Sequence, residues 1–191
     1  MDAGCEYHGY ASDITRTWPA GGNFSDPQQC VYEAVLDTQQ RLISSIVPGV
    51  TTIDGLYRDM QVITCQSGRA IIFFVQNILG KNLQSIGLID PKEEKYMSAR
   101  THEFCPHHVS HYLGMDVHDC GKASKKQPLL PGMVITVEPG CYIPAGKSTV
   151  DVRFRGIGCR IEDDLLITEG GVEVMSEGCP RTVQELEAIM S

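Results

Sequence analysis

Apolar residues recur at helical spacing through the middle of the chain, from about residue 25 to 100. One run repeats with a period near 3.6 and predicts a helix that Ser25 or Asp26 can cap and that the Pro-Gly pair at 48–49 ends. Its apolar positions are Val31, Val35, Leu36, Leu42, Ile43 and Ile46. A second helix is expected to begin at Thr51 or Thr52 and to continue through Leu56 and Met60.

Strand-type patterns lie on both sides of this helical region. Residues 2–24 combine aromatic and β-branched residues with glycine-rich breaks, which predicts two short strands and a turn. Further strands are expected at 113–117, 133–138 and 160–168, and a short helix at 182–190. Strands, then helices, then strands indicate an α+β fold rather than alternating βαβ units. A length of 191 residues suits one domain.

Composition and charge exclude several classes of function. The formal net charge is −8, which argues against binding to nucleic acid or to anionic lipid. The most apolar run, at 70–75, is far shorter than the ~20 residues of a membrane span, and no signal peptide is evident. The eight cysteines are scattered without a CxxC pair, so we expect mostly buried, reduced thiols in an intracellular protein.

Two aspartates in the first strand region are candidate metal ligands. Asp2 and Asp13 fall on short strands that the bend at 4–12 joins. Neighbouring strands stand ~4.8 Å apart, so two inward carboxylates can share a metal ion or bridge two. A turn residue and a strand-end cap would explain the same two positions without any metal.

Histidines concentrate in one short segment, where four of the six lie between His107 and His118. Imidazole is a common ligand for divalent transition metals and the side chain best suited to acid–base chemistry near neutral pH. The apolar residues around Gly114 place these histidines on or beside an expected strand. An exposed loop that happens to be rich in histidine is the alternative.

Two further acids close buried strands. Glu138 ends the apolar run 133–138, and Glu162 follows Arg160 in the strand expected at 160–168, on the same face. A carboxylate at such a position must be paired or bound to metal, or it costs several kcal/mol. A salt bridge for each glutamate is the alternative. Asp2, Asp13, His111, Glu138 and Glu162 together predict a two-metal hydrolase site.

The strings around these residues resemble the pita-bread metallopeptidases, family M24. They are DAGCEYHGYASDITRTWP, HHVSHYLGMDVHD, LLPGMVITVEPGCYI and GIGCRIEDDLLIT, in family order and across residues 2 to about 175. HYLGMDVHD and EPGCYIP are similar to aminopeptidase P, the Xaa-Pro aminopeptidases, or prolidase, and the whole pattern is most similar to the Xaa-Pro aminopeptidase 3 type. The resemblance implies hydrolysis of the N-terminal Xaa-Pro bond of peptides, with prolidase activity on Xaa-Pro dipeptides as the alternative.

The resemblance also implies a role for each site residue. Asp2 would chelate one ion, His111 and Glu138 would bind the second, and Asp13 and Glu162 would bridge both. The ions, most often manganese in this family, would activate the attacking water molecule. The implied catalytic residues around the metals are His107, His118, Tyr142 and Arg160. Of these, the two histidines would handle the proton and steady the tetrahedral intermediate.

The resemblance has two departures. The family's catalytic domain has further strands, a helix and one more active-site histidine before the DAG motif, so residues 1–191 resemble a C-terminal catalytic pita-bread domain that is truncated at its N-terminus. Residues 62–78 look like an insertion into a helix. We therefore expect weak or no activity from the isolated chain, and a non-catalytic binding domain is a further alternative. The resemblance implies a homodimer for the full-length protein, and a mitochondrial or cytoplasmic location.

Overall fold

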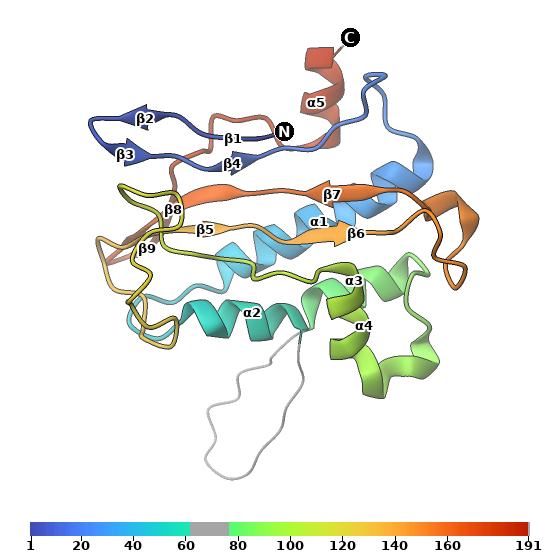
Figure 1. The fold of residues 1–191 in the computed structure, drawn as a ribbon, viewed down its shortest axis with the longest axis horizontal. Coiled ribbons are helices and arrows are strands. Elements are labelled where there is room, and N and C mark those ends of the chain that lie inside the picture. The colour runs from blue at the N-terminus through green and yellow to red at the C-terminus, as the bar shows by residue number, and fades with distance from the viewer. Residues whose placement is uncertain (62–76, 191) are drawn as a thin grey trace.

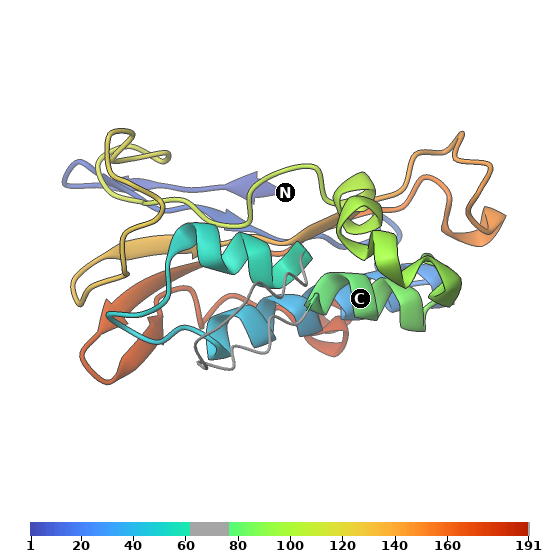
Figure 2. The same cartoon turned by 90° about the horizontal axis from the view of Figure 1, so that it is seen from below.

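The strands form one layer of the molecule, and most of the helices form a second layer beneath it (Figures 1 and 2). The computed structural model describes residues 1–61 and 77–190. The strands of this part are β1 (Asp2–Ala3), β2 (Glu6–Tyr7), β3 (Tyr10–Ala11), β4 (Ile14–Thr15), β5 (Val134–Val137), β6 (Gly140–Tyr142), β7 (Gly158–Arg160), β8 (Asp163–Thr168) and β9 (Gly171–Val174). The helices are α1 (Asp26–Ser44), α2 (Ile53–Gln61), α3 (Ile78–Ser85), α4 (Met97–Phe104) and α5 (Val183–Met190), with 3-10 turns η1 (Pro91–Tyr96) and η2 (Val152–Phe154).

Antiparallel pairing brings distant segments together at their ends. β5 pairs with β8, β8 with β9, and β6 with β7, while β1 and β4 form the stem of a long hairpin whose tip is β2 and β3. The Glu162 N–H donates to the Thr15 carbonyl over 3.0 Å, which joins the hairpin stem to the segment between β7 and β8. The predicted strands near the N-terminus, at 133–138 and at 160–168 are confirmed, the last as two strands.

Helix α1 anchors the second layer. Ser25 and Gln28 form a capping box at its start and Pro27 occupies its first turn, so the orphan N–H groups are satisfied locally. Its apolar face is fully buried, with Val31 and Val35 at 0% exposure. Burial of such side chains contributes about 1.5–3 kcal/mol each. The predicted helices at 25–46 and from 51 or 52 to 60 are confirmed as α1 and α2, and the one at 182–190 as α5.

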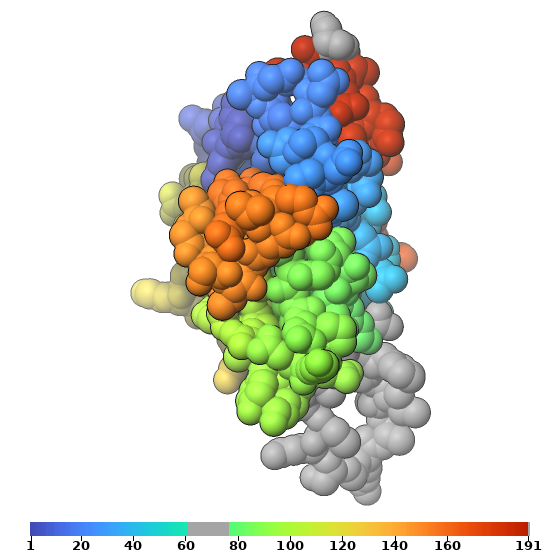
Figure 3. Space-filling model, turned by 90° about the vertical axis from the view of Figure 1, so that its right-hand side faces the viewer, coloured from blue at the N-terminus to red at the C-terminus, as the bar shows by residue number. Residues whose placement is uncertain are grey.

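One side of the molecule closes through loops as well as helices. Figure 3 shows the segment between β6 and β7 in orange, packed against the green α3 and α4 region and the blue start of α1. Phe154 of η2 is buried there. Contacts of α4 with β6 and of α1 with η2 hold the two layers together on this side.

The strand predicted at 113–117 is wrong. Residues 113–119 form a series of bends, and Met115 is 67% exposed. The Asp119 carboxylate accepts the Met115 N–H over 3.0 Å and would lie 2.2 Å from a Cβ on Gly114, so this close turn replaces a strand. The single ladder contact is the bridge between Tyr112 and Ile135, which still fixes the preceding histidines beside β5.

Three other expectations can be compared with the fold. The expected insertion at 62–78 lies outside the described residues except for its last two positions. The seven cysteines in the described ranges are all free thiols, of which three are buried and Cys5 and Cys120 are exposed. Within 1–61 and 77–190, no helix combines the length and apolar character needed to cross a membrane.

Candidate metal centre

Three predicted ligands meet at the junction of the hairpin, β5 and β8. Asp13, His111 and Glu162 each offer a ligand atom within 4.8 Å of the others, and all three are buried. The Nε2 atom of His111 lies 3.4 Å from Asp13 Oδ2 and 3.8 Å from Glu162 Oε1. It also lies 3.6 Å from Oε1 of Glu138, which follows the last residue of β5. Four of the five predicted ligands therefore surround one imidazole nitrogen.

The fifth predicted ligand stands beside this group. Asp2 belongs to β1, opposite Thr15 of β4, and lines the same pocket. Its carboxylate is close enough to Asp13 to raise the pKa of that residue. In the structure Asp2 forms an ion pair with Arg160, so its carboxylate is shared between the acidic group and a cation.

Burial and mutual repulsion make this acidic group hold protons. Burial first, then the charges of Glu162 and Asp2, raise the pKa of Asp13 to about 6. Burial and the charge of Glu162 raise the pKa of Glu138 to about 7. Burial lowers the pKa of His111, but its hydrogen bond with Glu162 and the nearby carboxylates outweigh burial and raise it.

The same arrangement fits divalent cations. Nδ1 of His111 lies 3.0 Å from the Tyr112 carbonyl, which can only accept, so this nitrogen donates and Nε2 faces the carboxylates. The three distances from Nε2 exceed the ~2.7–3.2 Å of an ordinary hydrogen bond. Four carboxylates and one imidazole are a ligand set for hard or intermediate ions, and two divalent ions would cancel the repulsion that raises the pKa values.

A hydrogen-bonded chain links the predicted catalytic residues His107, Tyr142 and Arg160. The Nδ1–H of His107 donates to the His108 carbonyl over 2.8 Å, so its Nε2 accepts the Tyr142 hydroxyl proton over 3.0 Å. The Tyr142 oxygen in turn accepts from Nη1 of Arg160 over 3.4 Å. Burial lowers the pKa of His107, which keeps this imidazole neutral and able to accept.

The remaining predicted catalytic residue approaches from the other side. The ring of His118 is exposed and stands nearly perpendicular to that of His111, with centroids 4.4 Å apart. Both rings belong to one pocket with a volume of about 590 Å³. Its lining contains all nine predicted site residues except Tyr142, which reaches it through its contacts with His107 and Arg160.

Sequence reasoning missed Thr15, which connects the two groups. Its hydroxyl donates to Glu162 Oε2 over 2.7 Å and accepts from Nε of Arg160 over 3.2 Å. It therefore fixes the carboxylate of one predicted ligand and the guanidinium beside another. The available signal was its position next to Asp13 on a strand that faces the acidic run at 162–164, but the pairing itself was not predicted.

A buried ion network behind the site was also missed. Asp163 is 0% exposed and accepts from Arg16 over 2.6 Å, from Gln39 over 2.7 Å and from Ser176 over 2.6 Å. Arg16 also donates to the Glu162 carbonyl over 2.6 Å. Residues from β4, α1 and the segment after β9 thus hold the backbone of a predicted ligand in place.

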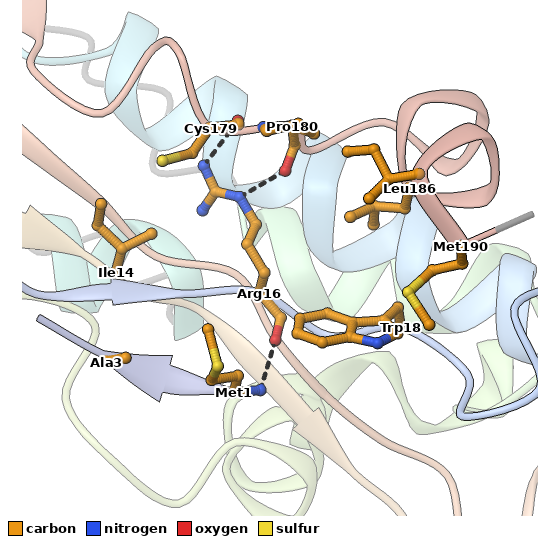
Figure 4. Close-up of a pocket in the computed structure, with 10 residues that line it drawn as sticks. Met1, Ala3, Ile14, Arg16, Trp18, Cys179, Pro180, Leu186 and Met190 are labelled. Atoms are coloured by element: carbon orange, nitrogen blue, oxygen red, sulfur yellow. Dashed lines mark hydrogen bonds between the residues drawn. The ribbon is translucent and has the colours of Figure 1, made fainter.

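An apolar pocket of about 330 Å³ lies away from this chemistry (Figure 4). Met1, Trp18, Leu186 and Met190 surround it, and Arg16 is its one charged lining residue among those described. That guanidinium is already used, because it donates to the carbonyls of Pro180 and Cys179, as the dashed lines in Figure 4 show, and to Asp163. The acidic pocket is therefore the candidate site.

Comparison with known proteins decides the family. The model of metallopeptidase family M24 matches residues 1–169. The chain belongs to this family. Members of family M24 are metallopeptidases that use divalent metal ions, which agrees with the buried group of Asp13, His111 and Glu162.

Several relatives in family M24 are named for Xaa-Pro peptides. Xaa-Pro aminopeptidase 3 of Rattus norvegicus is 43% identical over the whole chain, which spans 34% of that protein. Intermediate cleaving peptidase 55, mitochondrial, of Arabidopsis thaliana is 38% identical, and the chain again spans 34% of it. The Xaa-Pro aminopeptidase of Escherichia coli is 37% identical, with 40% of its length covered.

Solved structures give the same result for the fold. Pseudomonas aeruginosa aminopeptidase PepP matches 99% of this chain and 40% of its own, with a TM-score of 0.81 and 38% identity. Zinc-substituted E. coli aminopeptidase P in complex with product matches 99% and 40% in the same way, with a TM-score of 0.83 and 37% identity. The predicted α+β pita-bread fold is confirmed.

The acidic group predicts how the stability of the metal-free chain depends on pH. Asp13, Glu138 and His111 all have raised pKa values in the folded state, so the stability they contribute is present at low pH and is lost as the pH rises through those values. His107 and His108 have lowered pKa values and oppose this below about pH 6.5.

We therefore expect a higher free energy of unfolding for the metal-free chain at pH 6.5 than at pH 8. Urea titrations in the presence of a chelator measure it. The Glu138→Gln variant should show a smaller difference, because it lacks the carboxyl group with a pKa of about 7. Equal stability at both pH values in the parent chain would contradict the electrostatic description of the site.

Proposed function

We propose that Asp2, Asp13, His111, Glu138 and Glu162 bind two divalent ions and that the protein hydrolyses the N-terminal Xaa-Pro bond of peptides. The single observation that carries this is the convergence of four acids around Nε2 of His111 within one pocket. Relatives named Xaa-Pro aminopeptidase, 37–43% identical across the whole chain, support the substrate class. Because the chain spans 34% of the rat relative, this activity is a proposal for the protein as a whole.

In this proposal the ions lower the pKa of a water molecule and polarise the scissile carbonyl. The residues of the chain arrange the rest of the site. Thr15 holds the Glu162 carboxylate, and Arg160 holds Asp2, so both acids are oriented before any substrate arrives. Such preorganisation removes the need for side chains to move during the reaction.

The proposed catalytic residues His107, His118, Tyr142 and Arg160 act on protons and on the developing charge. His107 is neutral and bonded to the Tyr142 hydroxyl, so this pair can pass a hydrogen bond to a substrate oxygen. The exposed imidazole of His118 faces the pocket and is free to donate or accept a proton near His111. The Arg160 guanidinium supplies a positive charge 3.4 Å from the Tyr142 oxygen.

The finer features of the proposal concern the ion and the assembly. Manganese is proposed because the set contains four carboxylates and one imidazole, although a zinc-substituted form of the E. coli relative is known. We further propose that residues 1–191 are the C-terminal catalytic part of the protein with an insertion at 62–78, and that the whole protein forms a homodimer. A mitochondrial location is proposed because the Arabidopsis relative is named as mitochondrial, with the cytoplasm as the alternative.

Peptide hydrolysis tests the proposed function. With manganese, we expect release of the first residue from Xaa-Pro-Yaa-Zaa, and no release after chelation. The same sequence with alanine in place of the proline is the matched substrate control and should be cleaved much more slowly. Cleavage of the Xaa-Pro dipeptide alone would indicate a prolidase instead. Metal-independent release would contradict the proposal.

A further inference from the structure

A basic side chain lies on the wall of the pocket opposite the family motifs. The loop 119–128 contributes Cys120, Gly121, Ala123 and Lys125 to the lining. Lys125 and Arg160 are the two lysine or arginine residues of the described lining. Arg160 is paired with Asp2, whereas Lys125 has no ion-pair partner among the residues that the structure describes.

The backbone of this loop is fixed at two places. The Lys125 carbonyl accepts the N–H of Asp54 at the start of α2 over 3.0 Å. The adjacent Ser124 carbonyl accepts the Tyr112 hydroxyl over 3.1 Å, and Tyr112 follows the predicted ligand His111 directly. Lys125 is therefore attached to both sides of the pocket, while its side chain remains exposed and can reach toward a bound molecule.

The charge of Lys125 already acts inside the pocket. Burial, followed by the positive charge of Lys125, lowers the pKa of the pocket residue His108. Asp54 opposes this effect, since its carboxylate lies 3.6 Å from Nε2 of His108. The other acid on this side, Asp119, is occupied by the N–H groups of Met115 and Cys120 at 3.0 and 2.6 Å. Neither acid forms an ion pair with Lys125.

The geometry points to Lys125 as a specificity-determining residue that binds a carboxylate of the peptide on the C-terminal side of the scissile bond. This inference rests on the proposed function. A substrate of an aminopeptidase has one residue before the bond, so the rest of the peptide must leave the metal centre along the pocket wall. The carboxylate can belong to an Asp or Glu side chain or to the C-terminus, and both have the same chemistry toward an ammonium group.

Binding of non-hydrolysable peptides tests this directly. Four analogues of Xaa-Pro-Yaa, with a reduced scissile bond, carry Glu or Gln at the third position and a free or amidated C-terminus. Their affinities for the manganese-loaded chain are measured by calorimetry. We expect at least one carboxylate to bind about three- to fivefold tighter than its neutral counterpart, the size of a solvent-exposed ion pair. The pair that shows the preference identifies which carboxylate is recognised.

Variants separate Lys125 from general electrostatics. Lys125→Gln should abolish the preference, Lys125→Arg should keep it, and Lys125→Glu should reverse it. Lys126→Gln is the matched control, because Lys126 is exposed in the same loop but does not line the pocket, and it should keep the preference. An unchanged preference in Lys125→Gln, equal binding of all four analogues, or no binding of any of them would overturn the inference.

Failure of the proposed function would be visible separately. The amidated Xaa-Pro-Gln peptide with a normal scissile bond carries no carboxylate, so its hydrolysis does not depend on Lys125. If it is not cleaved but the binding preference is present, the inference stands and the proposed activity fails. If it is cleaved and the preference is absent, the activity stands and the inference fails.

Discussion

Glu162→Gln is expected to stabilise the metal-free chain and to abolish turnover. Glu162 is 2% exposed and raises the pKa of both Asp13 and Glu138, so at neutral pH its charge works against folding when no cation is present. Glutamine keeps the size of the side chain and can still accept from Thr15 through its amide oxygen. The unfolding midpoint in chelator should therefore rise.

The same substitution should reverse the effect of metal. A neutral amide is a poor bridging ligand, so the rise in melting temperature on adding manganese should shrink, and hydrolysis of Xaa-Pro peptides should fall about a thousandfold, equivalent to ~4 kcal/mol of transition-state stabilisation. Glu173→Gln is the matched control, because Glu173 is exposed on β9 and absent from the pocket. A variant that retains activity, or one that is destabilised without metal, would contradict the assignment of Glu162.

Asp163→Ala is expected to destabilise the chain by about 3–5 kcal/mol. The substitution removes a carboxylate that is 0% exposed and leaves Arg16, which is 7% exposed, without its ion-pair partner. It also removes the acceptor of Gln39 and of Ser176. Chemical denaturation with metal absent measures the loss without any contribution from ligand binding.

An exposed ion pair supplies the comparison for this prediction. Asp151 and Arg153 form a salt bridge at 2.9 Å on the surface, with side chains 43% and 68% exposed. Asp151→Ala should leave the midpoint of unfolding unchanged, because exposed pairs are solvated and contribute little. Similar losses in Asp151→Ala and Asp163→Ala would show that burial of the network is not what makes it stabilising.

Local signals in the sequence predicted the elements better than their contacts. The 3.6 periodicity and the Ser25 cap predicted α1, and alternating apolar runs predicted β5 and β8. The strand expected at 113–117 failed because a side chain, Asp119, competes for the backbone N–H of Met115, which no periodicity reveals.

The candidate ligands could be predicted, whereas their supports could not. Each ligand ends a strand or lies in a dense histidine segment, so its residue type stands out locally. Thr15 and Asp163 act through partners that are 147 residues away in each case, Glu162 and Arg16 respectively. Such roles depend on the register between β4 and the segment before β8, which is a tertiary property.

The number of manganese ions bound per chain tests the central claim most directly. Calorimetric titration of the metal-free chain at pH 8, where the raised pKa values leave the carboxyl groups charged, does not depend on catalytic activity. The account predicts about two ions per wild-type chain, as in two-metal hydrolases generally, and fewer for Glu162→Gln. Binding of no ion by the wild type, or the same two ions by the variant, would contradict it.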